Sequence, residues 1–140
     1  METRNFSWHN REAVNELYIH DSEFTGYTYT YDISRDAHEI LLSCKNYFLQ
    51  KVFFFTFHRV VYHEMQGCSF WYKGDSIQRV YLGNKKLHEL QLPNVNDAQD
   101  DPNPCWDYEE YLHVILYTNG GDVLSIFCEN FDFREEPLQE

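Results

Sequence analysis

The sequence predicts a mainly β fold of the α+β class, in which a short N-terminal helix precedes about eight mostly antiparallel strands that form a curled sheet, a sandwich or a partly open barrel. Aromatic residues make up 18% of the chain, and aromatic and β-branched side chains favour pleated sheets. Segments of alternating polarity recur between turn signals. The run from Val52 to Tyr62 is apolar on both faces, so we expect it in the middle of a sheet that is covered on both sides.

The first elements follow from the spacing of apolar residues. Between residues 10 and 18 the apolar side chains recur at helical spacing, which predicts a short amphipathic helix that ends in a polar turn at 19–22. Residues 23–32 alternate strictly, with Tyr27, Tyr29 and Tyr31 on one face, and form a strand. A turn at 34–36 leads to a second strand at 40–44 that pairs back on the first.

Further strands follow the central run. A bend at 63–67 leads to a strand at 68–73. Residues 77–82 and 85–92 flank Gly83-Asn84 and predict a hairpin. The clearest hairpin signal joins strands at 111–118 and 123–128, and 131–134 extends the second of them past a kink.

We expect one domain over residues 1–140, because the length is that of a single domain and neither a linker nor a repeat interrupts the chain. The segment 93–107 is rich in Pro, Asn and Asp and predicts a long acidic surface loop, which is uncommon in compact domains unless it is functional or disordered. The polar tail 135–140 is expected to fray.

The chain carries 23 acidic and 11 basic residues, so its formal net charge is −12. Such a chain is repelled by nucleic acid and by anionic membranes and is steered toward a basic protein partner. The alternative is that the charge only keeps an aromatic-rich domain in solution. No signal segment and no apolar stretch of 18 residues is present, which predicts a cytoplasmic protein. The sequence predicts no particular oligomeric state.

The cysteines and histidines indicate no catalytic or metal site. Cys44, Cys68, Cys105 and Cys128 are widely spaced and are interpreted as buried free thiols; two disulfides are the alternative if the protein is exported. The seven histidines lack a metal-ligand spacing. No nucleophile motif and no phosphate-binding loop occurs, so we expect no enzyme activity and no cofactor.

The best candidate for a binding surface is the acidic segment that ends the long loop. Carboxylates there are interleaved with aromatic side chains, which are common anchors of protein interfaces. The predicted binding residues are Asp97, Asp100, Asp101, Trp106, Asp107, Tyr108, Glu109 and Glu110. The alternative is a solvated loop whose aromatic residues fold back onto the sheet.

Two segments resemble known families. Residues 17–24 read Leu-Tyr-Ile-His-Asp-Ser-Glu-Phe and precede two strands that end at Cys44, and residues 124–131 read Leu-Ser-Ile-Phe-Cys-Glu-Asn-Phe. Both are similar to segments of small uncharacterised bacterial β-rich families, some of whose members are assigned as immunity proteins of polymorphic toxin systems. The resemblance implies a bacterial protein that binds and neutralises a partner. Asp21 and Ser22 have an alternative role, in which they hydrogen-bond the backbone between helix and strand.

Two other hypotheses stay open. In one, Tyr27, Tyr29 and Tyr31 line, with Trp71, the cavity of a small-ligand-binding barrel or of an enzyme, with His58 or His113 as the polar group. In the other, the tyrosine face is a contact between copies of the chain.

Overall fold

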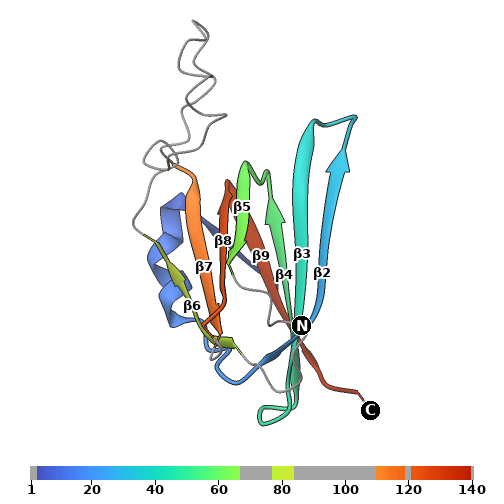
Figure 1. Cartoon of the computed structure of the whole chain (residues 1–140), viewed down its shortest axis with the longest axis vertical. Helices are drawn as coiled ribbons and strands as arrows, with labels where there is room; N and C mark the ends of the chain where they lie inside the picture. The colour runs from blue at the N-terminus through green and yellow to red at the C-terminus, as the bar shows by residue number, and fades with distance from the viewer. Residues whose placement is uncertain (1–2, 67–76, 84–109, 119–120, 140) are drawn as a thin grey trace, which may run out of the picture.

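The computed structural model describes residues 3–66, 77–83, 110–118 and 121–139, and these contain nine strands and one 3-10 helix (Figure 1). The elements are β1 (Thr3–Ser7), η1 (Trp8–Glu16), β2 (Glu23–Asp32), β3 (Ala37–Asn46), β4 (Lys51–His58), β5 (Tyr62–Gln66), β6 (Ile77–Leu82), β7 (Leu112–Thr118), β8 (Val123–Cys128) and β9 (Asn130–Pro137). A five-stranded sheet has the order β1-β9-β4-β3-β2, and a four-stranded sheet has the order β5-β8-β7-β6. All described strand pairs are antiparallel.

Two neighbouring stretches of chain pass from one sheet to the other. β4 continues into β5 through a bend at Arg59, whose φ is 52°, and β8 continues into β9 around Glu129. At the bend the backbone N–H of Val60 donates to His38 in the first sheet and that of Val61 donates to Phe127 in the second, each over 2.9 Å. Among the described strands, the two sheets are therefore joined along one corner and do not close into a barrel, which agrees with the sandwich among the predicted forms.

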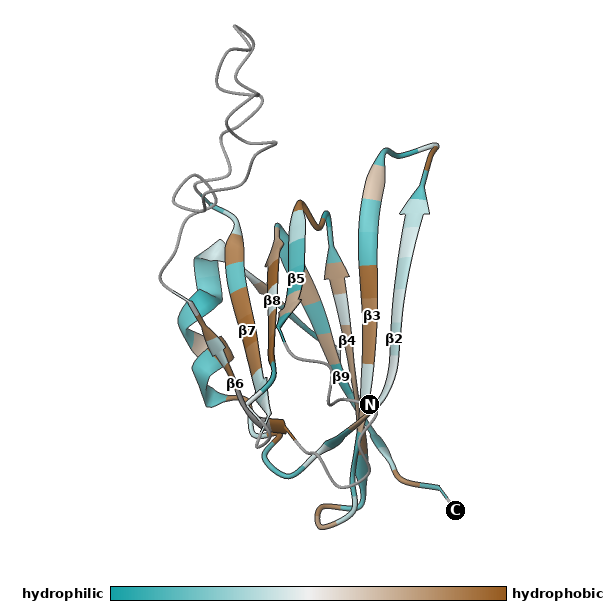
Figure 2. Ribbon diagram, in the orientation of Figure 1, coloured by the Kyte–Doolittle hydropathy of each residue, from teal (hydrophilic) through white to brown (hydrophobic). Residues whose placement is uncertain are grey.

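The core lies between the two sheets and is rich in phenylalanine. Figure 2 shows the hydrophobic bands on β3, β7 and β8, whereas β2 is pale or hydrophilic along its length. In the five-stranded sheet the stacked and edge-on rings of Phe53, Phe55, Phe57, Phe131 and Phe133 fill the inner face. Aliphatic side chains of β7 and β8 cover them from the other sheet. Burying such rings is the main stabilising contribution.

The N-terminal helix differs from the prediction. It is a 3-10 helix that starts at Trp8 and ends at Glu16, not an amphipathic α-helix over 10–18. Asn10 has non-helical dihedral angles inside it, and its amide accepts from the Ser7 N–H over 2.7 Å and donates to the Asn5 carbonyl over 2.9 Å. A side chain that binds the backbone in this way competes with regular helix. The helix packs against β1 and β6 and so covers the edge strands at one side of the sandwich.

Most of the predicted strands are confirmed, including the strand at 23–32 and the hairpin of β7 and β8. β4 is the third of five strands, as expected for the apolar run, but this run is not one strand, because it bends at Arg59 to change sheets. The predicted bend at 63–67 is wrong, since β5 occupies most of it. The tail is also ordered further than predicted, because β9 pairs with β4 as far as Pro137. The predicted strands at 68–73 and 85–92 lie outside the described residues.

Candidate functional site

Most of the predicted acidic surface lies outside the described residues, which include only Glu110. The others are Asp97, Asp100, Asp101, Trp106, Asp107, Tyr108 and Glu109. Glu110 is exposed and lies two residues before the start of β7. It lines a pocket of about 600 Å³ where β1, η1, the residues before β7 and the junction of β8 and β9 meet. The lining residues are Asn5, Ser7, Trp8, His9, Glu110, Tyr111, Glu129 and Asn130.

Glu129 is the second carboxylate of this pocket and has defined partners. The phenol of Tyr111 donates to its Oε2 over 3.4 Å, and Nε of Arg59 lies 3.3 Å from the same oxygen. Both Glu129 and Arg59 are largely exposed, so this ion pair contributes little to stability. Among the described residues no cation forms an ion pair with Glu110. Within that part of the chain, the pocket thus presents one carboxylate with such a partner and one without.

Trp8 is an aromatic lining residue of the pocket, and its side chain is held by the core and by Arg11. It packs partly buried against the core. The guanidinium of Arg11 lies 4.0 Å from the centre of its ring, and Nη1 of Arg11 donates to the Trp8 carbonyl over 2.6 Å. In this cation–π contact the indole of Trp8 binds the guanidinium of Arg11. Two carboxylates beside aromatic rings form the environment that a Lys or Arg side chain of another molecule prefers.

A polar network extends from the pocket over the outer face of the five-stranded sheet. Asn5 donates to Asn130 over 3.1 Å and to Asp132 over 2.9 Å. His58, which we considered as the polar group of a tyrosine-lined cavity, lies on this outer face with Nε2 2.8 Å from Asp132 and Nδ1 3.2 Å from Glu39. Burial would raise the pKa of Asp132, but the hydrogen bonds from Asn5 and His58 outweigh it and lower the pKa. Within the described residues no group of three or more His, Cys, Asp or Glu side chains is arranged to hold a metal ion.

A second pocket, of about 460 Å³, lies on the outer face of the four-stranded sheet. His113 lines it, with Nε2 2.6 Å from the Ser125 hydroxyl and its ring stacked 4.2 Å from that of Phe127. Tyr62 donates to Glu64 over 2.5 Å, and burial together with this bond raises the pKa of Tyr62 to about 12.

The Ser125 and His113 pair has the distance of a nucleophile and its base. Both residues, however, lie within paired strands, where the ladder uses the backbone N–H groups that an oxyanion hole would need. We therefore interpret the pair as a cross-strand hydrogen bond that orients the imidazole.

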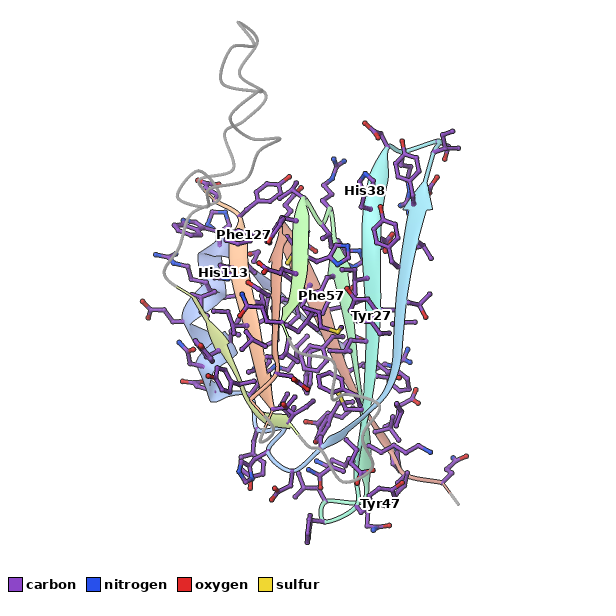
Figure 3. The ribbon with its side chains drawn as sticks, viewed as in Figure 1. Tyr27, His38, Tyr47, Phe57, His113 and Phe127 are labelled. Carbon is purple, nitrogen blue, oxygen red and sulfur yellow. The ribbon has the colours of Figure 1, made fainter. Side chains whose placement is uncertain are left out.

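The predicted tyrosine face exists, but its neighbours are not those expected. Tyr27 lies 2.9 Å from Nδ1 of His63, Tyr29 contacts His38, and Tyr31 donates to Asp36 over 2.7 Å. The tyrosine and histidine rings form one row of stacked and tilted contacts that reaches from β2 to β5. Figure 3 shows Tyr27 and His38 on one side of the molecule and His113 on the other, with Phe57 between them. Trp71 lies outside the described residues.

The titration of this row follows from its partial burial. Burial and the proximity of His38 lower the pKa of His63. Burial raises the pKa of Tyr27.

The His-Asp-Ser segment has a clear structural role. Ser22 is fully buried, and its backbone accepts from the Ile77 N–H over 2.7 Å while the Asp21 N–H donates to the Ile77 carbonyl over 2.9 Å. Asn46, which is also buried, donates to the His20 carbonyl over 2.9 Å and to the Ser22 hydroxyl over 3.1 Å. These bonds tie the end of the helix region to β3 and β6, but they use the backbone of Asp21 and Ser22 and the side chain of Asn46, not the side-chain bonds of Asp21 and Ser22 to the backbone that we expected.

The two described cysteines are free thiols in the core. Burial raises the pKa of Cys44 and of Cys128, so both stay protonated at neutral pH. Cys68 and Cys105 lie outside the described residues.

Comparisons with known proteins identify no relative: no family model matches the chain, and no curated protein or solved structure shows significant similarity to it. In the part of the chain that the structure describes, no helix has the length and apolar character needed to cross a membrane.

Proposed function

We propose that this protein is a non-catalytic binding module whose acidic pocket receives a Lys or Arg side chain of a basic protein partner, as an immunity-like inhibitor would. The observation that carries the proposal is that Glu110 and Glu129 line one pocket together with Trp8 and Tyr111. Carboxylates and aromatic rings together bind a guanidinium by charge-assisted hydrogen bonds and by cation–π contact.

The charge of the chain supports the same partner class. A net charge of −12 raises the association rate of a basic protein through long-range attraction. The acidic residues of segment 93–110 directly precede Tyr111 in the sequence and contribute to this net charge. The resemblance of residues 17–24 and 124–131 to families that include immunity proteins supports an inhibitory role for the complex.

The test uses N-acetyl-arginine amide as a probe of the pocket, with the neutral isostere N-acetyl-citrulline amide as its control. In ¹⁵N-resolved NMR titrations we expect arginine amide to shift the indole N–H of Trp8 and the backbone N–H groups of Tyr111 and Glu129. The double variant E110Q/E129Q weakens this binding by about twofold to thirtyfold, since each exposed carboxylate contributes about 0.2–1 kcal/mol. Glu16→Gln, an exposed charge change on η1 outside the pocket, leaves it unchanged.

A tetra-arginine peptide separates a protein partner from a small cation. If the acidic surface around the pocket takes part, this peptide binds at least about tenfold more tightly than arginine amide and loses affinity as salt is added. Equal affinity of the two probes would contradict a protein partner and would indicate a small-cation site. Equal shifts with citrulline amide, or full binding by E110Q/E129Q, would remove the pocket from the proposal.

The second candidate function, small-ligand binding, is favoured by the pocket that His113, Ser125, Tyr62 and Glu64 line together with aliphatic neighbours. Polar groups that converge in a hollow are the usual feature of such sites. A fragment screen by NMR, in which hits shift Ser125 and fail to bind a Ser125→Val variant, would support it; a screen without such hits would contradict it.

A further inference from the structure

β2 differs from the other strands that end a sheet. It is the last strand of the five-stranded sheet and, in the part of the chain that the structure describes, it pairs with β3 alone. Ten residues long, it is twice the length of β1 and β5, which have five residues each. η1 packs against two of the other edge strands, β1 and β6. β2 is thus the long edge of the sandwich, and Figure 1 shows it at the outer side of the sheet.

The sequence of β2 lacks the features that usually protect an edge. From Phe24 to Tyr31 it contains neither a charged residue nor Pro, whereas natural edges are usually short, charged, bulged or covered. Its one irregularity is a register shift between Phe24 and Gly26, which leaves residues 26–32 in regular pairing. Tyr27, Thr28, Tyr29 and Thr30 are all exposed. Their outward backbone N–H and C=O groups form a ready template for another strand.

We propose that β2 pairs antiparallel with β2 of a second copy of this chain about a two-fold axis at Thr28. The residues on either side of Thr28 are the reason for choosing a second copy. In that register Thr28 faces Thr28, Tyr27 faces Tyr29 and Gly26 faces Thr30, so each pair of unlike residues occurs twice. Threonine pairs and aromatic pairs are favourable cross-strand neighbours, and no like charges stand opposite one another. A two-fold contact of this kind is self-complementary and closed, so it ends at the dimer.

The tyrosines are already positioned for this pairing. Contacts with His63, His38 and Asp36 hold the phenols of Tyr27, Tyr29 and Tyr31 in one row on the inner face of β2. A two-fold axis perpendicular to the sheet places the row of the second copy beside it on the same face. Little side-chain entropy is then lost on association, because the rings are ordered before the copies meet.

Electrostatics gives the dimer a characteristic salt dependence. Each copy carries a net charge of −12, so two copies repel each other, and this repulsion is screened by salt. The dimer therefore tightens as salt is added, whereas the binding of a basic partner to the acidic pocket weakens. The two interactions are distinguishable by this sign alone.

The experiment measures the mass of the full chain by sedimentation equilibrium from low micromolar to high micromolar concentration, at about 50 mM and about 500 mM NaCl, conditions between which the screening length falls severalfold. We expect a monomer–dimer equilibrium that shifts toward the dimer at the higher salt. Thr28→Lys and Thr28→Asp each place like charges opposite one another at the axis and weaken the dimer about fivefold. An equimolar mixture of the two variants restores it, because the introduced lysine of one copy then faces the introduced aspartate of the other.

Thr3→Lys and Thr3→Asp are the matched controls, since Thr3 is an exposed threonine on the edge strand β1. They leave the dimer intact, and circular dichroism with thermal melting shows that every variant folds. A chain that stays monomeric over the whole range, association that continues beyond the dimer, or a mixture of the Thr28 variants that stays as weak as either alone would each overturn the proposal.

Discussion

The substitution Gly83→Ala tests how closely the end of β6 approaches His113. The Gly83 N–H donates to the His113 carbonyl over 2.7 Å. A Cβ at Gly83 would contact Nδ1 of the imidazole and would lie 2.7 Å from its Cε1 and 2.8 Å from its Cγ. Real Cβ contacts essentially never come below 3.0 Å, so the ring must move. It is held by Ser125 on one side and by Phe127 on the other.

The magnitude follows from two opposing contributions. Overpacking of this kind costs about 1–3 kcal/mol. Gly83 is not among the residues with positive φ, so alanine fits its backbone and would otherwise stabilise by about 0.4–1 kcal/mol through the unfolded chain. The net expectation is a loss of about 1.5 kcal/mol in the free energy of unfolding. With a urea m-value of about 2 kcal/mol/M, the midpoint falls by about 0.7 M.

The assay is urea unfolding of a double-mutant cycle. In the His113→Ala background the imidazole is absent, so Gly83→Ala should stabilise the protein by about 0.4–1 kcal/mol. The change in the free energy of unfolding caused by Gly83→Ala is thus expected to have opposite signs in the two backgrounds. A Gly83→Ala variant as stable as the original chain, or one equally destabilised in both backgrounds, would refute the steric argument.

Three further predictions concern packing, hydrogen bonding and pH. Phe55→Ala, at a fully buried ring, is expected to cost about 3–5 kcal/mol in urea unfolding, whereas Phe54→Ala on the half-buried outer face costs about 1 kcal/mol; equal losses would contradict the assignment of the faces. Asn46→Ala removes hydrogen bonds to the His20 carbonyl, the Ser22 hydroxyl and the Leu49 N–H. It is expected to lower the free energy of unfolding by about 2–4 kcal/mol. A loss below about 1 kcal/mol would show that these hydrogen bonds do not stabilise the fold as expected. Hydrogen bonds from Ser34 and Arg35 lower the pKa of Asp32 to about 2, so they stabilise the fold above about pH 4, and this stabilisation is lost as the pH falls toward about 2. Ser34→Ala should raise the pKa of Asp32 in a carboxyl ¹³C NMR titration. An unchanged pKa would contradict the role of these hydrogen bonds.

Local patterns explain most of what could be predicted about the fold. The alternation of Thr and Tyr over 23–32 has the period of a strand, and β2 has those same bounds. The apolar run after Lys51 was correctly placed in the centre of a sheet. Its break at Arg59 was not predictable, because a non-glycine residue with positive φ carries no sequence signal. Val60 lies at this bend and faces the core, which partly explains why the run after Lys51 is apolar on both faces.

Long-range pairing explains what could not be predicted. Residues 3–7 have no strand pattern, and they form β1 because β9 supplies its partner, Phe6 stacking on Phe131. The candidate pocket depends on the same pairing, which brings Trp8 beside Glu129. Of that pocket only Glu110 was predicted, from the acidic run in the sequence. Proximity of residues so far apart in the chain has no local signature in one sequence.

The position of β9 has a consequence for how the chain is made. β9 lies between β1 and β4, yet it comes later in the sequence than every other described strand. During synthesis on the ribosome β1 therefore lacks its described partner, and the Phe-rich β4 is paired only on its β3 side, until residues 130–137 have left the exit tunnel. Nascent chains stalled before that point would expose the rings of β4 and would bind chaperones. Once residues 130–137 are also outside the ribosome, β9 can pair with β1 and β4 and complete the sheet in one step.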